Sequence, residues 1–409
     1  MKAMGPIPRG FEAGPDGRLM IGGHDCEALV EEAGGTPLFV YDNNLVGARI
    51  ATFRHSMPSG VKLHYAVKAN PYQPLLRWLS KHVDGFDVAS LGELEAIEQA
   101  GVGGVAISFA GPGKSDAELR RAIRDGVTIH LESEGEAARA LAIAGELGER
   151  PRLSVRVNPP FALKGAGMKM GGHASQFGID HDRVAEVVRG LIEAGAEWRG
   201  LHFYAGSQCL DWAALAETFR QGIALAAEIS EAAGAELPEV NLGGGLGIPY
   251  FDGDEQVDID ALGQALSEQL AGAPESLAAT QFIVELGRWL VGEAGVYLAR
   301  ITDRKQSRGK TFLVTDGGLH HMLAASGNFG QLLRRNYPVA IASRYGAPST
   351  DEASIVGCLC TPLDLLADEV AVPAADVGDL VAIFCAGAYG LSASPQSFLS
   401  QAKAREMLL

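Results

Sequence analysis

Cysteine is scarce in this chain. Its 409 residues include 5 cysteines, an odd number, and no two of them are spaced as C-x-x-C. This pattern does not favour a disulfide framework or a structural zinc site. We therefore expect no bound metal and a reducing, cytoplasmic environment. The five are Cys26, Cys209, Cys358, Cys360 and Cys385.

Long apolar stretches and an excess of basic residues are also missing. No run of about 18 apolar residues is present, which argues against a membrane-spanning helix. The opening MKAMGPIPRGFEAGPDG lacks the apolar segment of a signal peptide. The chain has 34 Lys and Arg against 50 Asp and Glu, a formal net charge of −16. We therefore expect no nucleic acid or membrane partner bound through a broad basic surface.

Apolar side chains are plentiful, at 47% of residues, and the length favours two domains. From about residue 62, short segments rich in β-branched or aromatic residues alternate with helix-like segments. One of these helices is predicted to begin with a capping box formed by Ser115 and Glu118. The predicted strands are Val61–Val67, Gly85–Ser90, Gly104–Ala110, Val127–Ser133, Arg152–Asn158, Trp198–Gly206, Glu239–Gly245 and Gln281–Arg288.

Eight strands with helical crossovers predict an α/β fold, a (β/α)8 TIM barrel over residues 42–288. A doubly wound open sheet is the alternative. Polar motif residues follow many of the strands, whereas an open sheet concentrates them at its switch point, so the barrel is favoured. Within residues 289–409, short segments alternate between apolar and polar side chains or are continuously apolar. This pattern predicts a C-terminal β-rich barrel domain. Strand-like segments within residues 1–41 are expected to join that second domain.

A lysine closes the first predicted strand. Lys68 stands in HYAVKAN, and the carboxyl ends of barrel strands form the mouth where such enzymes carry out their chemistry. Partial desolvation there favours a nucleophilic amine that can form an imine. A solvated surface lysine is the alternative for this residue taken alone.

Three later strand ends carry groups suited to an anion or a planar ring. NLGGGLG, residues 241–247, offers backbone N–H groups to a phosphate, although a tight turn explains such glycines equally well. ELGR contains Glu285, which needs a donor if it is buried, and Arg288, whose fork geometry suits phosphate or carboxylate. An internal ion pair of these two is the alternative. In HFYAGSQ, Ser207 is a phosphate candidate, and Tyr204 or His202 is a stacking candidate.

Taken in order, these motifs resemble the fold-type III pyridoxal-phosphate decarboxylases, the alanine-racemase-like family that includes diaminopimelate, ornithine and arginine decarboxylases. The likeness covers nearly the whole chain. It is carried further by FDVAS (Phe86–Ser90), SVRVN (Ser154–Asn158), GCLCTPLDLL and GAYG (Gly387–Gly390). The resemblance implies a pyridoxal 5'-phosphate cofactor, a carboxy-lyase activity and a homodimer with shared active sites.

The resemblance also implies roles for individual residues. Lys68 would form the Schiff base, Glu285 would pair with the pyridine nitrogen, and Cys360 would protonate the carbanion, reaching the site from the partner chain. Asp87 and Arg156 would lie near Lys68 and the ring hydroxyl. The residues around the phosphate would be Ser207, Gly244, Gly245, Gly287, Arg288 and Tyr389.

Departures from the family pattern bear on the substrate. Tyr204 occupies the place of a histidine that stacks on the ring in relatives acting on free basic amino acids. Ala324 and Ala325 replace an Arg-Pro pair that holds the far carboxylate of diaminopimelate. Thr361 follows the catalytic cysteine where an acidic residue normally binds a distal amine. Removing that carboxylate from a desolvated site disfavours lysine, ornithine, arginine and diaminopimelate.

Several variants resemble a subgroup that acts on conjugated amino acids, including siderophore-pathway and butirosin-pathway decarboxylases. HHMLAASGNFGQLLRRNYP is similar to exosortase-associated decarboxylases. The expected substrate is an amino acid or a conjugate, which a carrier protein could deliver. A diaminopimelate or ornithine decarboxylase, an amino-acid racemase and a non-catalytic pyridoxal-phosphate carrier remain alternatives. Predicted substrate-binding residues are Arg288, His321, Asn328, Thr361 and Tyr389, whereas the roles of His320, Arg334 and Arg335 stay open.

Overall fold

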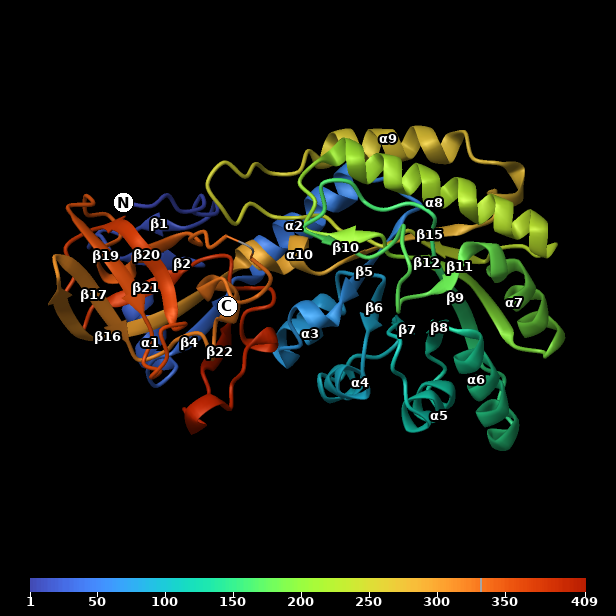
Figure 1. Ribbon diagram of the computed structural model, residues 1–409, viewed down its shortest axis with the longest axis horizontal. Helices are drawn as coiled ribbons and strands as arrows, with labels where there is room; N and C mark the ends of the chain where they lie inside the picture. The colour runs from blue at the N-terminus through green and yellow to red at the C-terminus, as the bar shows by residue number, and fades with distance from the viewer. Residues whose placement is uncertain (332) are drawn as a thin grey trace. The chain divides into compact units, whose positions relative to one another are not determined.

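The computed structural model describes residues 1–331 and 333–409, and it divides the chain into two compact units (Figure 1). The barrel unit comprises Ile50–Gly247 and Gln256–Gly287. The β unit comprises Met1–Arg49, Ile248–Glu255 and Arg288–Leu409. The short segment Ile248–Glu255 therefore groups with the β unit although it lies between two barrel strands in the sequence. The domain boundaries predicted from the sequence remain a prediction, separate from this division into two units.

Eight parallel strands form the barrel. Their pairing order is β5-β6-β7-β8-β9-β12-β14-β15, and β15 pairs with β5, so the sheet closes on itself. Closure confirms the predicted TIM barrel and excludes the doubly wound open sheet, which would leave two edges unpaired. The strands are β5 Lys62–Ala66, β6 Gly85–Val88, β7 Ala106–Phe109, β8 Thr128–Leu131, β9 Arg152–Asn158, β12 Glu197–Phe203, β14 Glu239–Asn241 and β15 Gln281–Leu286.

Helices follow the strands in sequence and lie outside the sheet (Figure 1). Ser115 caps α5 in a capping box with Glu118, as the sequence predicts. Asp211 caps α8 through its side chain, and Gly234 ends the helix in the left-handed conformation that glycine favours. The helices are α3 Gln73–Leu79, α4 Leu91–Gln99, α5 Asp116–Arg124, α6 Glu134–Leu147, α7 His181–Glu193, α8 Trp212–Ala233 and α9 Ile259–Ala271.

Short elements accompany the barrel strands. A two-residue strand, β10 (Met168–Lys169), pairs antiparallel with β13 (Gly206–Ser207), so that Met168 lies opposite Ser207. Another, β11 (Ile179–Asp180), extends the sheet beside β9. The 3-10 helix η1 (Val67–Ala69) follows β5 directly, and η2 (Glu275–Leu277) precedes β15.

The β unit is built on an eight-stranded sheet with the path β18-β21-β16-β17-β19-β20, in which β4 pairs with β16 and β22 pairs with β4. The N-terminal strand β4 is fully buried and pairs with both β16 and β22. The strands are β4 Leu38–Tyr41, β16 Gly295–Ser307, β17 Lys310–Thr315, β18 Val339–Ile341, β19 Asp351–Val356, β20 Leu365–Val372, β21 Leu380–Ile383 and β22 Arg405–Leu408.

Smaller elements complete the β unit. Its apolar core includes Leu38 of β4, Val296 of β16 and Phe384 after β21, all fully buried. Helix α2 begins in the β unit and ends in the barrel unit. The remaining elements, α2 among them, are β1 Glu12–Ala13, β2 Leu19–Ile21, β3 His24–Asp25, α1 Cys26–Glu32, α2 Asn43–Ser56, α10 Arg288–Val291, η3 Gly292–Ala294, η4 Leu323–Ser326, η5 Ala342–Arg344, η6 Leu391–Ala393 and η7 Phe398–Ser400. Across the described residues, no helix is both long and apolar enough to cross a membrane.

Candidate functional site

Lys68 lies just beyond the carboxyl end of β5, in the turn η1. Its neighbours Val67 and Ala69 are buried, whereas Lys68 itself is exposed. The Lys68 Nζ atom lies 5.0 Å from the centre of the Tyr204 ring, which follows β12. The turn therefore anchors the backbone and presents the amine at the end of the barrel where active sites of this architecture are found.

Glu285 is buried inside the barrel and has two hydrogen-bond partners. His202 Nε2 and Asn241 Nδ2 each lie 3.1 Å from Glu285 Oε2. Burial alone raises the pKa of this carboxyl, but His202, with smaller contributions from Lys68 and Arg156, outweighs burial and holds the pKa at about 2. The structure thus supplies the donors that a buried carboxylate requires.

Three consecutive glycines allow the chain after β14 to approach neighbouring backbone closely. A Cβ atom on Gly244 would lie 1.9 Å from the carbonyl oxygen of Glu285, and one on Gly245 would lie 2.7 Å from that of Gly206. Gly243 and Gly245 also have positive φ angles, 73° and 95°. Any side chain here would displace the backbone, so the glycines leave a bare turn close to the strand that carries Ser207, which is buried.

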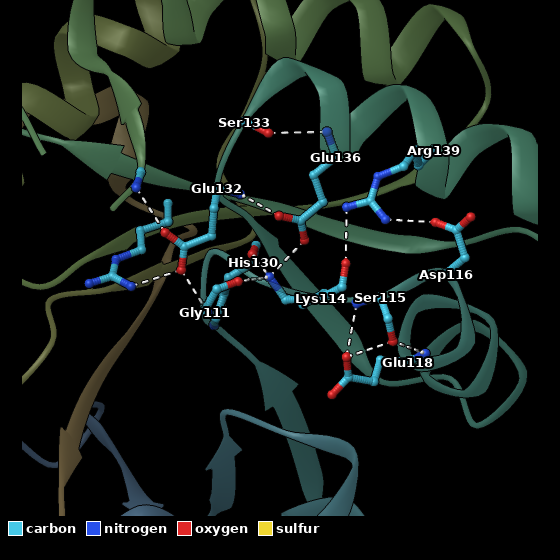
Figure 2. Close-up of polar contacts among 12 residues, drawn as sticks. Gly111, Lys114, Ser115, Asp116, Glu118, His130, Glu132, Ser133, Glu136 and Arg139 are labelled. Atoms are coloured by element: carbon cyan, nitrogen blue, oxygen red, sulfur yellow. Dashed lines mark hydrogen bonds and ion pairs between the residues drawn. The ribbon is translucent and has the colours of Figure 1, made fainter. Parts of the chain in front are cut away.

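Arg156 is held by a carboxylate that the sequence prediction missed. Its Nη1 atom donates to Glu132 Oε1 at 2.8 Å, and its guanidinium lies over the rings of Phe177 and Tyr204 at 4.8 and 5.9 Å. Glu132 also accepts from the backbone N–H groups of Gly111 and Gly178, at 2.6 and 2.8 Å (Figure 2). Its position directly after the fourth barrel strand could have marked Glu132 as a residue of the site.

Asp87 lies on β6 and is buried. Its Oδ1 atom accepts from the Ser108 hydroxyl and lies 3.5 Å from His64 Nδ1. Its Oδ2 atom is buried without a hydrogen-bond partner among the described residues. Burial lowers the pKa of His64, but Asp87 outweighs this effect and the pKa is raised. Asp87 therefore belongs to a polar cluster within the barrel.

In the β unit, Arg288 lies among tyrosines. Its Nη1 atom donates to the Tyr250 hydroxyl at 2.8 Å, and its guanidinium lies 5.4 Å and 4.6 Å from the ring centres of Tyr250 and Tyr389. The Arg288 Nε atom is buried without a partner among the described residues. This nitrogen is an unused donor in a place suited to an anionic group. Tyr389 itself has a positive φ of 54°.

The segment around Cys360 is a compact turn. Cys360 is exposed, Cys358 is partly buried and Cys385 is fully buried. The Asp364 carboxylate accepts from the backbone N–H groups of Leu319 and Leu359, at 2.6 and 2.8 Å, and so fixes the turn. Exposure distinguishes Cys360 from the other two cysteines.

The predicted substrate-binding residues His321 and Asn328 have internal partners. His321 is buried, with Nδ1 3.1 Å from the Tyr297 hydroxyl and Nε2 2.8 Å from the Ala402 carbonyl oxygen. Asn328 Nδ2 donates to Ser326 Oγ at 2.8 Å. Their role toward a substrate stays a prediction.

Residues whose roles the sequence left open also have neighbours. His320 is buried and packs against His321, with ring centres 3.8 Å apart. Arg334 donates to the Leu365 carbonyl oxygen, and the Arg335 guanidinium lies 3.8 Å from the centre of the Phe251 ring. These contacts are compatible with structural roles.

An amine at a strand end, a buried carboxylate and a turn without side chains are suited to a cofactor that carries an aldehyde, a basic ring nitrogen and a phosphate. Pyridoxal phosphate has these three groups, so the residues present fit it. Residues 44–292 match the family described as pyridoxal-dependent decarboxylase, pyridoxal binding domain. The chain belongs to this family.

Relatives extend the similarity over nearly the whole chain. The L-glutamyl-[BtrI acyl-carrier protein] decarboxylase of Niallia circulans is 35% identical over 91% of this chain and 88% of its own length. The 2-[(L-alanin-3-ylcarbamoyl)methyl]-2-hydroxybutanedioate decarboxylase of Staphylococcus aureus is 32% identical over 88% of this chain and 91% of its own. Diaminopimelate decarboxylase from M. jannaschii, solved with L-lysine, has a TM-score of 0.86 and 27% identity over 98% of this chain and 92% of that one.

These similarities confirm the predicted family, the barrel fold, the cofactor and the carboxy-lyase class. The protein is a pyridoxal-phosphate-dependent decarboxylase that acts on an amino-acid-type substrate. The racemase and the non-catalytic carrier are thereby set aside.

Proposed function

We propose that this decarboxylase acts on an amino-acid conjugate, including one attached to a carrier protein. The observation that carries the proposal is the loss of two charged residues, one acidic residue and one arginine, at positions that bind the far end of a free amino acid in the family. Thr361 replaces an acidic residue, and its Oγ1 atom accepts from the Leu363 N–H at 3.3 Å within its own turn. Ala324 and Ala325 are buried and apolar.

A free diamine or diacid needs a partner for its distal charge, because an unpaired charge in a desolvated site costs several kcal/mol. A conjugate with a neutral linkage has no such requirement. The relatives from Niallia circulans and Staphylococcus aureus, named for a carrier-bound glutamyl group and for a conjugate, support the same conclusion.

We assign the cofactor groups to residues on the basis of the family motifs. Lys68 supplies the amine that reacts with the aldehyde, and Glu285 faces the ring nitrogen. When bound, pyridoxal phosphate takes up the electron pair left as carbon dioxide departs. We place Asp87 and Arg156 near Lys68 and the hydroxyl group of the cofactor ring. The residues that the family motifs assign to the phosphate are Ser207, Gly244, Gly245, Gly287, Arg288 and Tyr389.

Cys360 is the proposed proton donor to the carbon that has lost carbon dioxide. Its exposure suits delivery from one protomer to the site of another in a homodimer. Cys360→Ala should slow turnover or misplace the proton, and Cys358→Ala is the matched control. Mixing Cys360→Ala with Lys68→Ala should restore part of the activity if sites are shared. No recovery in a demonstrated mixed dimer contradicts sharing.

The substrate proposal is tested by release of labelled carbon dioxide from a panel of free and conjugated amino acids. Diaminopimelate, ornithine, lysine and arginine form the free set, and a glutamyl-loaded carrier protein and amide conjugates form the other. Preference for the conjugates is expected. Preference for a free diamino acid would replace the proposal by the diaminopimelate or ornithine alternative.

The cofactor assignment is tested separately with Lys68→Ala. This variant should lose cofactor absorbance after borohydride treatment and denaturation, together with carbon dioxide release. Lys62→Ala, at the opposite end of β5, is the control and should keep both. Retained turnover in Lys68→Ala contradicts the assignment.

A further inference from the structure

Two stacked histidines lie beside Glu285 inside the barrel. His202 on β12 and His130 on β8 have ring centres 4.4 Å apart and ring planes inclined by only 17°. Both side chains are buried. The sequence suggested that His202 could stack on a planar ring, and the ring it meets in the described structure is that of His130.

The hydrogen bonds of His202 indicate which nitrogen carries its proton. Nε2 lies 3.1 Å from Glu285 Oε2, whereas Nδ1 is buried without a partner among the described residues. A carboxylate oxygen can only accept a hydrogen bond, so Nε2 carries a proton and donates it to Glu285.

Asn241 provides a second donor with a fixed orientation. Its Oδ1 atom accepts from the Gly243 N–H at 2.8 Å, so its Nδ2 atom is directed to Glu285 Oε2 at 3.1 Å. Both donors thus meet the same oxygen of Glu285. The glycine turn and the carboxylate are thereby linked through one amide side chain.

We propose that His202 is a positioning residue for Glu285, with Asn241 as the second donor and His130 fixing the plane of His202 by stacking. The inference rests on the proposed function, in which Glu285 faces the ring nitrogen of the cofactor. Holding Oε2 from within the barrel fixes the carboxylate in the orientation that this contact requires.

The test compares three variants of the holoenzyme. His202→Phe keeps a flat ring against His130 but removes the donor, whereas His202→Gln places an amide N–H near the position of Nε2. His130→Phe keeps the stacking face and removes only nitrogens that have no described partner. The readouts are the absorbance of the bound cofactor against pH without substrate, kcat and thermal stability.

His202→Phe should lower kcat by about ten- to hundredfold, because a hydrogen bond to a charged group is lost. It should also move the pH dependence of cofactor absorbance, and His202→Gln should restore part of both. His130→Phe should resemble the wild type. The inference is overturned if His202→Phe keeps the wild-type kcat and absorbance. It is also overturned if His202→Phe and His202→Gln lower kcat equally and lower the thermal stability while the absorbance stays unchanged.

Glu285→Gln separates this inference from the proposed function. If Glu285→Gln leaves the cofactor absorbance unchanged, the assignment of Glu285 to the ring nitrogen fails and the inference fails with it. If Glu285→Gln changes the absorbance and His202→Phe does not, only the role of His202 is overturned.

Discussion

Replacing Lys114 by methionine should destabilise the barrel unit more than any ordinary surface substitution. The Lys114 and Glu136 side chains are 1% and 2% exposed, and Nζ lies 2.7 Å from Glu136 Oε1. Nζ also donates to the carbonyl oxygens of Gly111 and His130, at 2.8 and 2.9 Å (Figure 2). Methionine fills similar space but supplies none of these donors.

The magnitude follows from the charge left behind. Removing one partner of a buried ion pair costs about 3–5 kcal/mol. Burial raises the pKa of Glu136 even with Lys114 present, so in the variant this carboxyl can take up a proton and limit the loss. When the pKa of Glu136 is higher in the folded than in the unfolded state, the free energy of unfolding falls as pH rises. Lys114→Met should therefore lose more stability at about pH 8 than at about pH 5.

Urea unfolding followed by tryptophan fluorescence is a suitable assay. Three of the 4 tryptophans, Trp78, Trp198 and Trp212, belong to the barrel unit. Arg120→Met is the matched control, because the Arg120–Glu146 pair is 35% and 62% exposed. Such an exposed pair contributes about 0–1 kcal/mol.

Equal destabilisation by Lys114→Met and Arg120→Met would refute the reasoning. The double variant Lys114→Met with Glu136→Leu provides a further check, since it removes both charges. It should recover a large part of the loss caused by Lys114→Met alone. If the double variant loses as much stability as Lys114→Met and Glu136→Leu lose together when made singly, the two residues are not coupled.

Three further predictions concern stability. The pKa of Glu285 is lowered from its ordinary value of 4.5 to about 2, so the stability that this carboxylate contributes is present above pH 4.5 and is lost as the pH falls toward about 2. Glu285→Gln should flatten this acid dependence in thermal melts. Glu132→Gln leaves Arg156 without its carboxylate and should cost about 3 kcal/mol in urea unfolding, where an unchanged midpoint contradicts the pairing. Ser115→Ala removes the capping box of α5 and should cost about 1 kcal/mol, with Ser115→Asp as the rescue variant.

Much of the barrel could be predicted because its signals are local. Strand β9 has the bounds expected from its composition, and the turn after β5 places Lys68 where the pattern HYAVKAN suggested. The other strands are shorter than predicted, since the pattern does not mark where pairing ends. The glycines after β14 were recognised from their sequence, although only the close approach to Gly206 shows why glycine is needed.

The polar partners inside the barrel could not be predicted from local patterns. Lys114 stands in GPGKSD, which is typical of a solvated loop, yet its side chain is buried against Glu136. Glu132 falls within the predicted strand Val127–Ser133, and the sequence around it does not indicate its partner Arg156. A buried charge becomes recognisable only when its partner, which lies elsewhere in the sequence, is known.

The local features follow from short stretches of sequence: the capping box at Ser115, the succession of strands and helices, and a lysine placed after the first barrel strand. Closure of the sheet decided the rest. Pairing of β15 with β5 sets Glu285 opposite His64 and brings His202 and Asn241 to the same carboxylate. Such pairings depend on hydrogen bonds between strands far apart in the chain, so no short stretch of residues specifies them.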